Sequence, residues 1–234
     1  MASGTVHPSY RTCKKNNISL FASDPVRITE KFHSIQGEGP LMGIPMYFVR
    51  TNRCNLRCSW CDSTYTFSGG HEEPVDSLIL ESGSVWEEWI CFTGGEPLLQ
   101  ADAPDFISGV VKKGKKVLIE AGGSISITPY VSIENTVIDM DIKTPSSGES
   151  KSLREENLLL LRKSDYLKFV IKDERDYIYS RGFLQNHPEN TNNVFQPCYG
   201  TDLRWLAESV IRDSLNVRVM TQLHKHIWGE RHGV

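Results

Sequence analysis

The sequence predicts a single α/β domain built on a mostly parallel sheet with helical crossovers. Short apolar or β-branched runs alternate along the chain with amphipathic or polar stretches, a pattern typical of strands connected by helices. No internal repeat, low-complexity linker or change in composition divides the 234 residues. A chain of this length can bury a substantial core. We therefore expect one domain over residues 25–234, preceded by a polar, aperiodic extension over residues 1–24.

Each expected strand is a short run rich in apolar and β-branched residues. In chain order, the expected strands are Val26–Ile35, Ile44–Thr51, Ile90–Thr93, Lys116–Ala121, Thr136–Lys143, Tyr166–Ile171, Val194–Gln196 and Val217–Leu223. Parallel strands require long crossover connections, and most of these runs are separated by stretches long enough to hold a helix.

The expected helices lie in those connections. They are Val75–Trp89, Asp102–Lys113, Leu153–Lys163, Asp173–Asn186 and Asp202–Ser214. The last pattern is the clearest, because its apolar residues fall on one stripe and Thr201 or Asp202 can cap its start. The leucines at 158–161 are expected to lie in a buried part of the third helix.

Composition and charge exclude several classes of function. A hydrophobic content of 39% and a charged content of 24% suit a soluble globular protein. The formal net charge of -3 argues against broad electrostatic binding to nucleic acid or membranes. No apolar run approaches the ~20 residues of a membrane span, and the first residues lack the apolar region of a signal peptide. We expect a cytoplasmic, reducing location, where clustered cysteines more often bind metal or react than form disulfides.

Functional groups in parallel α/β folds gather at the carboxyl ends of the strands. Four conspicuous stretches follow predicted strands in this sequence. They are the cysteine-rich loop after Ile44–Thr51, the GGEP turn after Ile90–Thr93, Glu120 near the end of its strand, and TPSSG after Thr136–Lys143. We expect these stretches to meet at one edge of the sheet.

The cysteine-rich loop contains Cys54, Cys58 and Cys61 with the spacing Cys-x3-Cys-x2-Cys. Each iron of a [4Fe–4S] cluster usually takes one cysteine, so three thiolates would leave one iron open. An open coordination position is what a catalytic metal needs. The alternative is a zinc site with His33 or His71 as the fourth ligand, and a chance clustering of structural cysteines is a third interpretation.

Two further turns carry polar side chains. Glycines let the backbone of GGEP approach a ligand closely, and its Glu96 can pair with an ammonium group. Gln36-Gly37-Glu38-Gly39 and Arg50 would lie at the same end of the sheet, where an amide and a carboxylate can bind the edge of a pterin-like heterocycle and an arginine can clamp a carboxylate. Taken alone, these features also suit simple turns and a surface ion pair.

Together, these motifs resemble the 7-carboxy-7-deazaguanine synthase family of radical S-adenosylmethionine (SAM) enzymes. The shared residues are the CxxxCxxC spacing with Trp60 before the last cysteine, the GGE turn, and SIQGEG followed by G-x-P-x-x-F-x-R and CNLxCxWCDS. The resemblance extends from about Phe32 to Val234. It implies an incomplete (β/α) barrel, a [4Fe–4S] cluster, SAM and Mg²⁺. The implied activity is a lyase reaction in which a 5′-deoxyadenosyl radical starts the contraction of 6-carboxy-5,6,7,8-tetrahydropterin to 7-carboxy-7-deazaguanine, with loss of ammonia, in the queuosine and archaeosine pathway.

The resemblance also assigns roles to individual positions, with no catalytic residue beyond the cofactor chemistry. It implies that Cys54, Cys58 and Cys61 hold the cluster and that Ser63 ligates Mg²⁺. It implies SAM contacts from Trp60, Asp62, Gly95, Glu96, Asp141, Ile142, Lys143, Ser146, Gln196, Pro197, Cys198 and Tyr199. It implies substrate contacts from Ile35, Gln36, Gly37, Glu38, Arg50, Thr93, Glu120, His224 and the terminal carboxylate of Val234. An ordinary frayed C-terminal tail is the alternative for the last two.

The sequence departs from the family pattern at two places. Glu120 is followed by Ala-Gly-Gly where many members have Thr-Asn-Gly, so this chain lacks any contact that the asparagine would make. Ser63 stands where threonine is more usual. Serine keeps the hydroxyl oxygen but lacks the methyl group, so we expect weaker Mg²⁺ binding. Cys198 is expected to pack rather than to act as a fourth ligand, and Cys13 and Cys91 are expected to be unliganded thiols.

The implied partners are the pterin substrate, an electron donor such as flavodoxin or ferredoxin, and a second copy of the chain in a homodimer. Neither nucleic acid nor a membrane is expected as a partner. Two rival functions remain open at this point. One is a different radical SAM enzyme, such as an activase for a glycyl-radical enzyme, and the other is a non-catalytic zinc-binding module.

Overall fold

A computed structural model describes residues 25–188 and 192–234, so the expected extension and Cys13 lie outside the described residues. Within this part of the chain, one sheet has the strand order β3-β1-β2-β4-β5-β6-β7-β8-β9. The strands are β1 Val26–Ile35, β2 Pro45–Thr51, β3 His71–Glu73, β4 Trp89–Gly94, β5 Lys116–Ala121, β6 Thr136–Ile142, β7 Tyr166–Ile171, β8 Asn193–Pro197 and β9 Arg218–Val219. β1 is antiparallel to β2 and β3, and the other pairs are parallel. The predicted mostly parallel α/β sheet is confirmed.

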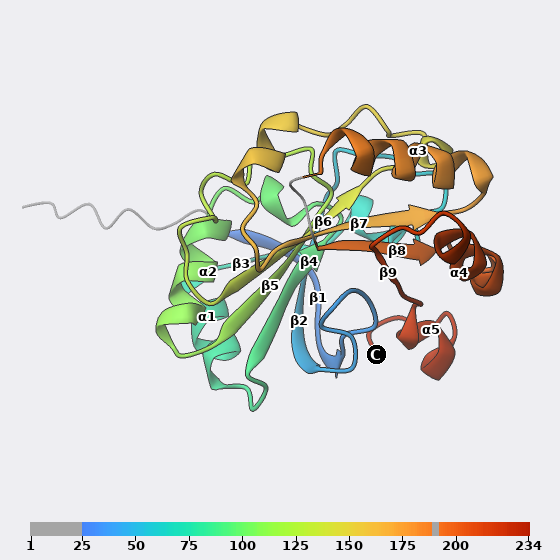
Figure 1. The fold of residues 1–234 in the computed structure, drawn as a ribbon. Coiled ribbons are helices and arrows are strands. Elements are labelled where there is room, and N and C mark those ends of the chain that lie inside the picture. Colours follow the sequence, from blue (N-terminus) through green and yellow to red (C-terminus); the bar gives the residue numbers. More distant parts are fainter. Residues whose placement is uncertain (1–24, 189–191) are drawn as a thin grey trace, which may run out of the picture.

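Helices cover the outer face of this curved sheet (Figure 1). These helices are α1 Val75–Ser84, α2 Ala103–Lys112, α3 Glu174–Asn186 and α4 Leu203–Arg212. The short α5 Leu223–Trp228 lies instead near the C-terminus, next to the loop after β1. Four short 3-10 helices are η1 Thr64–Phe67, η2 Pro97–Leu99, η3 Pro145–Ser147 and η4 Glu155–Leu160. The side chain of Asp202 accepts a hydrogen bond from the amide of Arg204, so the predicted cap of the last long helix is Asp202. No helix among the described residues has both the length and the apolar character to cross a bilayer.

The sheet has an apolar cluster on each face because its side chains alternate. Residues such as Phe92, Ile119 and Phe169 pack outward against the helices. A second cluster fills the concave inner side toward the amino ends of the strands, and consists of Met46, Phe48, Cys91, Leu118, Tyr166 and Val194. This inner cluster forms an apolar floor. The expected unliganded thiol Cys91 is fully buried in it.

Strand register places polar residues in a row just above this floor. Phe48, Cys91 and Leu118 are neighbours across β2, β4 and β5 in the floor. Two residues further along the same strands, Arg50 of β2 lies next to Thr93 of β4 in the strand register. Glu120 of β5 likewise lies next to Asp139 of β6. Because side chains two apart in a strand share a face, these polar groups all face the concave interior at the carboxyl ends of the strands.

Two helix predictions need correction. The expected helix Leu153–Lys163 is only the short 3-10 helix η4, because the buried side chain of Asn157 binds the carbonyls of Gly123 and Ile125 and ties the segment to that loop. Within its leucine run, Leu158 is buried but Leu159 is 83% exposed, so the predicted buried helix is wrong. α1 ends at Ser84 rather than Trp89, because Val85 is extended and Trp89 begins β4.

The end of the chain also differs from the prediction. The expected strand Val217–Leu223 is reduced to Arg218–Val219, and Leu223 begins α5, which was not predicted. The amide of Leu223 donates to the carbonyl of Gly37, so the chain leaves the sheet edge and returns to the loop after β1. The short strand β3 was also missed, because only three polar residues form it.

Candidate active site

A cavity of about 540 Å³ lies at the carboxyl ends of the parallel strands. Its walls come from the loops after β1, β2, β4, β5, β6 and β8, and from the C-terminal segment Gln222–Val234. Most of the residues singled out from the sequence line it: Ile35, Gln36, Gly37, Glu38, Arg50, Cys54, Cys58, Trp60, Cys61, Asp62, Ser63, Thr93, Gly95, Glu96, Glu120, Asp141, Lys143, Cys198, Tyr199, His224 and Val234. The fold therefore brings the four conspicuous loops together, as strand polarity predicts.

Four of the singled-out residues do not line the cavity. Ile142 faces the outer core, and Pro197 belongs to the fully buried strand β8. Ser146 binds away from the cavity, because its amide donates to Asp176 and its hydroxyl donates to Asp173. Gln196 is fully buried and neither its amide oxygen nor its amide nitrogen has a hydrogen-bond partner. A buried amide without partners leaves hydrogen-bonding capacity for a ligand.

The cysteine loop is fixed by its own backbone and by a neighbouring loop. The amide of Cys61 donates to the carbonyl of Cys58, which closes a turn. The amide of Ser59 donates to the carbonyl of Ser147, and the guanidinium of Arg57 donates to the carbonyl of Cys54. These contacts leave the thiols of Cys54, Cys58 and Cys61 free and partly exposed at the cavity.

Burial sets the charge state of the three thiols. It raises the pKa of Cys54 and Cys61 and raises the pKa of Cys58 to about 11, while the nearby ammonium of Lys143 acts in the opposite direction on all three. Because thiolates are the species that bind iron, loading the site must release protons. Three free thiols around one cavity fit a cluster with three protein ligands.

The histidines considered for a zinc site lie elsewhere. His33 pairs with the buried Glu87 at 2.5 Å, and His71 lies 3.5 Å from Glu73. Neither lines the cavity. The geometry does not support the zinc alternative.

The GGE turn packs directly against the cysteine loop. A Cβ atom on Gly95 would lie 2.4 Å from the carbonyl oxygen of Arg53, so only glycine allows this approach. The carboxylate of Glu96 accepts hydrogen bonds from the amides of Gly122 at 2.8 Å and Leu98 at 3.1 Å. Burial nevertheless raises the pKa of Glu96. Such a carboxylate gains a favourable partner when a ligand brings an ammonium group next to it, which fits the amino group of SAM.

The glutamine and glutamate of the QGEG turn take part in a polar network. The amide nitrogen of Gln36 donates to Glu120 at 2.9 Å, and the amide oxygen of Gln36 accepts from the backbone of Glu38. The carboxylate of Glu38 accepts from Lys168 at 2.7 Å and from Gln222 at 2.9 Å. The network connects the loop after β1 to the sheet and to the C-terminal segment.

Arg50 is held at the side of the cavity. Its guanidinium donates to Glu30 at 2.8 Å and lies 5.7 Å from the centre of the Phe32 ring. The hydroxyl of Tyr65 donates to the same Glu30 carboxylate. With only its Nε donating to Glu30, Arg50 keeps free N–H donors for a ligand carboxylate.

Ser63 and its neighbours supply oxygen atoms near the cysteine loop. The hydroxyl of Ser63 donates to the carboxylate of Asp62 at 2.9 Å, and the ammonium of Lys225 lies 3.9 Å from that carboxylate. Lys225 also lies 5.4 Å from the centre of the Tyr199 ring. A hydroxyl beside a carboxylate is a donor set that Mg²⁺ accepts, so the chemistry of these residues fits the ion.

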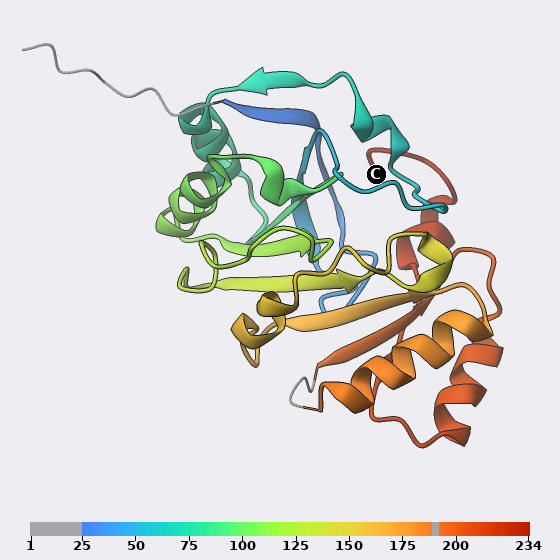
Figure 2. The same ribbon diagram turned by 90° about the horizontal axis from the view of Figure 1, so that it is seen from above.

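The C-terminal segment closes one side of the cavity. A Cβ atom on Gly37 would lie 2.2 Å from Nδ1 of His224, so the segment packs tightly on the QGEG turn. The rings of Tyr65 and His232 are 4.7 Å apart. Figure 2 shows the C-terminal end of the chain beside the segment that follows β2. The sequence alone left open whether this segment was a frayed tail.

Sequence reasoning assigned no role to several polar residues that line the cavity, among them Asp139, Lys168, Gln222 and Lys225. Asp139 and Lys168 each interrupt an otherwise apolar strand. A charged residue at an inward position of a buried strand was the signal that could have identified both. Burial raises the pKa of Asp139 to about 7.

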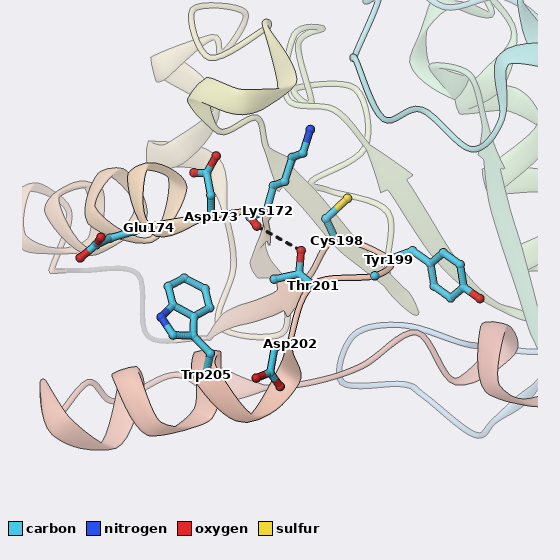
Figure 3. Close-up of a pocket in the computed structure, with 9 residues that line it drawn as sticks. Lys172, Asp173, Glu174, Cys198, Tyr199, Thr201, Asp202 and Trp205 are labelled. Atoms are coloured by element: carbon cyan, nitrogen blue, oxygen red, sulfur yellow. Dashed lines mark hydrogen bonds between the residues drawn. The ribbon is translucent and has the colours of Figure 1, made fainter.

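A second depression lies next to the cavity, between the starts of α3 and α4 (Figure 3). It is lined by Lys172, Asp173, Glu174, Cys198, Tyr199, Gly200, Thr201, Asp202 and Trp205. The hydroxyl of Thr201 donates to the carbonyl of Lys172 at 3.1 Å. Only Cys198 and Tyr199 border both spaces, so this depression is the outer surface of the wall that the two residues form.

Comparisons with known proteins agree with this geometry. Residues 48–162 match the family described as the Radical SAM superfamily. The chain is 50% identical over 207 residues to the 7-carboxy-7-deazaguanine synthase of Thermoplasma acidophilum, an alignment that covers 88% of this chain and 99% of the relative. It is 40% identical to the Koribacter versatilis enzyme of the same name, over 87% of this chain and 97% of the relative. The crystal structure of QueE from Escherichia coli superposes with a TM-score of 0.72 at 21% identity, covering 86% of this chain and 95% of that one.

Proposed function

The chain belongs to the 7-carboxy-7-deazaguanine synthase family of radical SAM enzymes, and we propose that the cavity carries out that family's reaction with the residues assigned below. The reaction contracts a 6-carboxytetrahydropterin to 7-carboxy-7-deazaguanine with loss of ammonia. The observation that carries the proposal is that one cavity holds both the three free thiols and the Gln36–Glu120 and Glu38 network. Neither rival function needs both features.

On the cofactor side, membership of the radical SAM superfamily implies a [4Fe–4S] cluster and SAM. When bound, this pair supplies the radical chemistry that removes a hydrogen atom at C6 of the substrate. We assign Cys54, Cys58 and Cys61 as the cluster ligands, since they are the free thiols at the cavity. Glu96 would receive the amino group of SAM. The other residues at the cavity that we propose contact SAM are Trp60, Asp62, Gly95, Asp141, Lys143, Cys198 and Tyr199. Ile142, Ser146, Gln196 and Pro197 belong to the same expected set, although none of the four lines the cavity as described.

On the substrate side, the QGEG turn presents an amide and a carboxylate toward the cavity. Gln36 and Glu38 can bind the donor and acceptor edge of the pterin, and Arg50 can bind its carboxylate. The other proposed contacts are Ile35, Gly37, Thr93, Glu120, His224 and Val234, all of which line the cavity. We assign Ser63 to Mg²⁺, supported by the oxygen atoms of Ser63 and Asp62 next to one another.

The partners stay predictions. One-electron reduction of the cluster needs a donor, for which a flavodoxin or a ferredoxin is suitable.

A homodimer would cover apolar surface such as Trp86, which is 74% exposed, and Leu80, which is 63% exposed. Sedimentation velocity of the wild type and of Trp86→Glu tests the dimer. A cytoplasmic location, where free thiols stay reduced, is also a prediction, as is the domain boundary near residue 25.

Cys58→Ala tests the cluster assignment. The variant should retain the fold but lose iron, sulfide and the broad visible absorption after anaerobic reconstitution, together with all turnover of carboxytetrahydropterin. Cys91→Ala is the matched control, because Cys91 lies in the floor and is not assigned as a ligand. Full turnover by Cys58→Ala, or zinc in place of iron in the wild type, would refute the assignment.

A further inference from the structure

The ammonium of Lys168 on β7 lies at the cavity and has no role in the proposal so far. Its side chain is only 6% exposed, yet it lines the cavity. Its Nζ lies 2.7 Å from Oε2 of Glu38, 3.1 Å from Oδ2 of Asp139 and 4.0 Å from Oδ2 of Asp141. A buried ammonium is costly unless carboxylates compensate for its lost hydration. Here Lys168 lies among three of them.

The charges of Lys168 and Glu38 stabilise each other. Burial alone would favour the neutral lysine, but Asp139 and Glu38 raise the pKa of Lys168 well above its usual value. Burial alone would also favour the neutral Glu38, but the nearby ammonium of Lys168 lowers the pKa of Glu38. Burial raises the pKa of Asp139 to about 7, so near neutral pH Glu38 is the more fully ionised of the two carboxylates closest to Lys168.

Lys168 also fixes the direction of the Glu38 carboxylate. It donates to Oε2, while Gln222 from the C-terminal segment donates to Oε1 at 2.9 Å. An ionised carboxylate has about four acceptor positions, so two donors leave room for N–H groups of a ligand. The 2-aminopyrimidinone edge of a pterin offers such N–H groups side by side.

We propose that Lys168 is a positioning residue for substrate recognition, which holds Glu38 in place so that this carboxylate can accept the N–H donors of the pterin edge. The inference rests on the proposed function, because it needs a pterin in the cavity. Without Lys168, the amide of Gln222 would be the remaining side-chain donor that holds Glu38, and burial would favour protonation of the carboxylate. Protonation would remove the negative charge and make one of the two oxygens an O–H donor, so Glu38 would bind a pair of N–H groups less well.

A structural role for the same ion pairs would give a different result. Lys168→Met has a side chain of similar length without charge, and Lys168→Arg keeps the charge. If Lys168 only stabilised the fold, Lys168→Met would lower the thermal unfolding midpoint but leave pterin affinity unchanged. Asp139→Asn/Lys168→Met is a second variant that avoids leaving the Asp139 charge buried without a partner.

The test measures binding of 6-carboxypterin, a fluorescent and unreactive analogue, to anaerobically reconstituted protein with SAM and no reductant. We expect Lys168→Met and Asp139→Asn/Lys168→Met to weaken binding by about 10- to 100-fold, and Lys168→Arg to stay within about threefold of the wild type. Lys116→Met is the matched control, since Lys116 forms a 2.8 Å ion pair with Glu88 away from the cavity. Its affinity should equal that of the wild type.

A double-mutant comparison shows whether Lys168 acts through Glu38. Glu38→Gln/Lys168→Met should bind 6-carboxypterin no more weakly than Glu38→Gln alone, because the second change removes nothing further. Additive losses would mean that Lys168 acts independently, which overturns the inference. Unchanged affinity in both lysine-to-methionine variants would overturn it as well. Absence of binding by the wild type would instead refute the pterin assignment in the proposed function.

Discussion

At the scale of single residues, several functional side chains in the cavity are held by backbone groups or by one fixed partner. Glu96 is oriented by two backbone amides, and Arg50 by Glu30. Such supports keep side chains in place before a ligand arrives, which reduces the entropy lost on binding. The hydroxyl of Ser63 is held less firmly, because it donates to the exposed side chain of Asp62.

Removing the Ser63 hydroxyl should therefore affect one property, the response to Mg²⁺. Ser63→Ala should raise the Mg²⁺ concentration needed for half-maximal turnover by about tenfold, while Ser63→Thr, which keeps the oxygen, should not raise it. Turnover rates measured over a range of Mg²⁺ concentrations give the answer. Ser126→Ala is the control, because its hydroxyl binds Thr128 outside the cavity. Equal Mg²⁺ responses for wild type and Ser63→Ala would contradict the assignment of Ser63.

At the scale of secondary-structure elements, the cavity depends on how the C-terminal segment packs against the loop after β1. The segment contacts the loop through the Leu223 amide, the Gln222 side chain and the ring of His224. Each contact involves Gly37 or Glu38. The wall is therefore sensitive to any atom added at position 37.

Gly37→Ala should displace the segment. The added Cβ would meet His224 at 2.2 Å, so the ring must move, and we expect the KM for the pterin to rise by about tenfold with a smaller change in thermal stability. Gly182→Ala is the control, because nothing lies within 4 Å of the added atom in α3. It should stabilise the fold by about 0.5–1 kcal/mol without altering the KM. An unchanged KM in Gly37→Ala would show that the segment does not form this wall.

Helices α3 and α4 are joined by Asp213, which gives a pH-dependent contribution to stability. Hydrogen bonds from Arg212, Tyr177 and Arg181 lower the pKa of Asp213 to about 2, from 3.8. Because the folded-state pKa lies below the unfolded one, the stabilisation is fully present above about pH 4 and is lost as the pH falls toward 2. In Asp213→Asn the side chain has no carboxyl group to titrate, so the variant lacks this pH-dependent contribution to stability.

Urea unfolding of wild type and Asp213→Asn at pH 7, 4 and 3 measures this contribution. The difference in unfolding free energy should be similar at pH 7 and pH 4, and should shrink at pH 3. A difference that stays constant down to pH 3 would contradict the linkage. Screening by high salt should reduce the difference at pH 7, since the groups lie near the surface.

The sequence predicts elements well where local patterns determine them. The central apolar strands were placed within two residues, because a buried strand needs a continuous apolar run. The extent of α1, the form of η4 and the existence of α5 could not be predicted, because each depends on a distant partner: for example, Asn157 binds the 123–125 loop and Leu223 binds Gly37. The cysteine, GGE and QGEG loops were recognisable because their function needs particular residues at particular spacings. Lys168 was overlooked because its role depends on carboxylates far away in the sequence.

At the scale of the whole molecule, the curved sheet separates two environments. An apolar floor closes the inner side below, and the polar row and the loops above it form the cavity. Charged groups are thus brought together in a site where water has limited access and electrostatic interactions are strong. The same sheet, helices and strand order serve as a scaffold, while the loops at one end determine the chemistry.

The central claim is that this cavity converts a carboxytetrahydropterin to a deazaguanine. The most direct measurement is anaerobic incubation of reconstituted protein with reductant, SAM, Mg²⁺ and 6-carboxy-5,6,7,8-tetrahydropterin, with quantitation of 7-carboxy-7-deazaguanine by mass spectrometry and of ammonia. We predict that both products form in equal amounts, and that neither forms with Cys58→Ala. Formation of 5′-deoxyadenosine without 7-carboxy-7-deazaguanine would contradict the account.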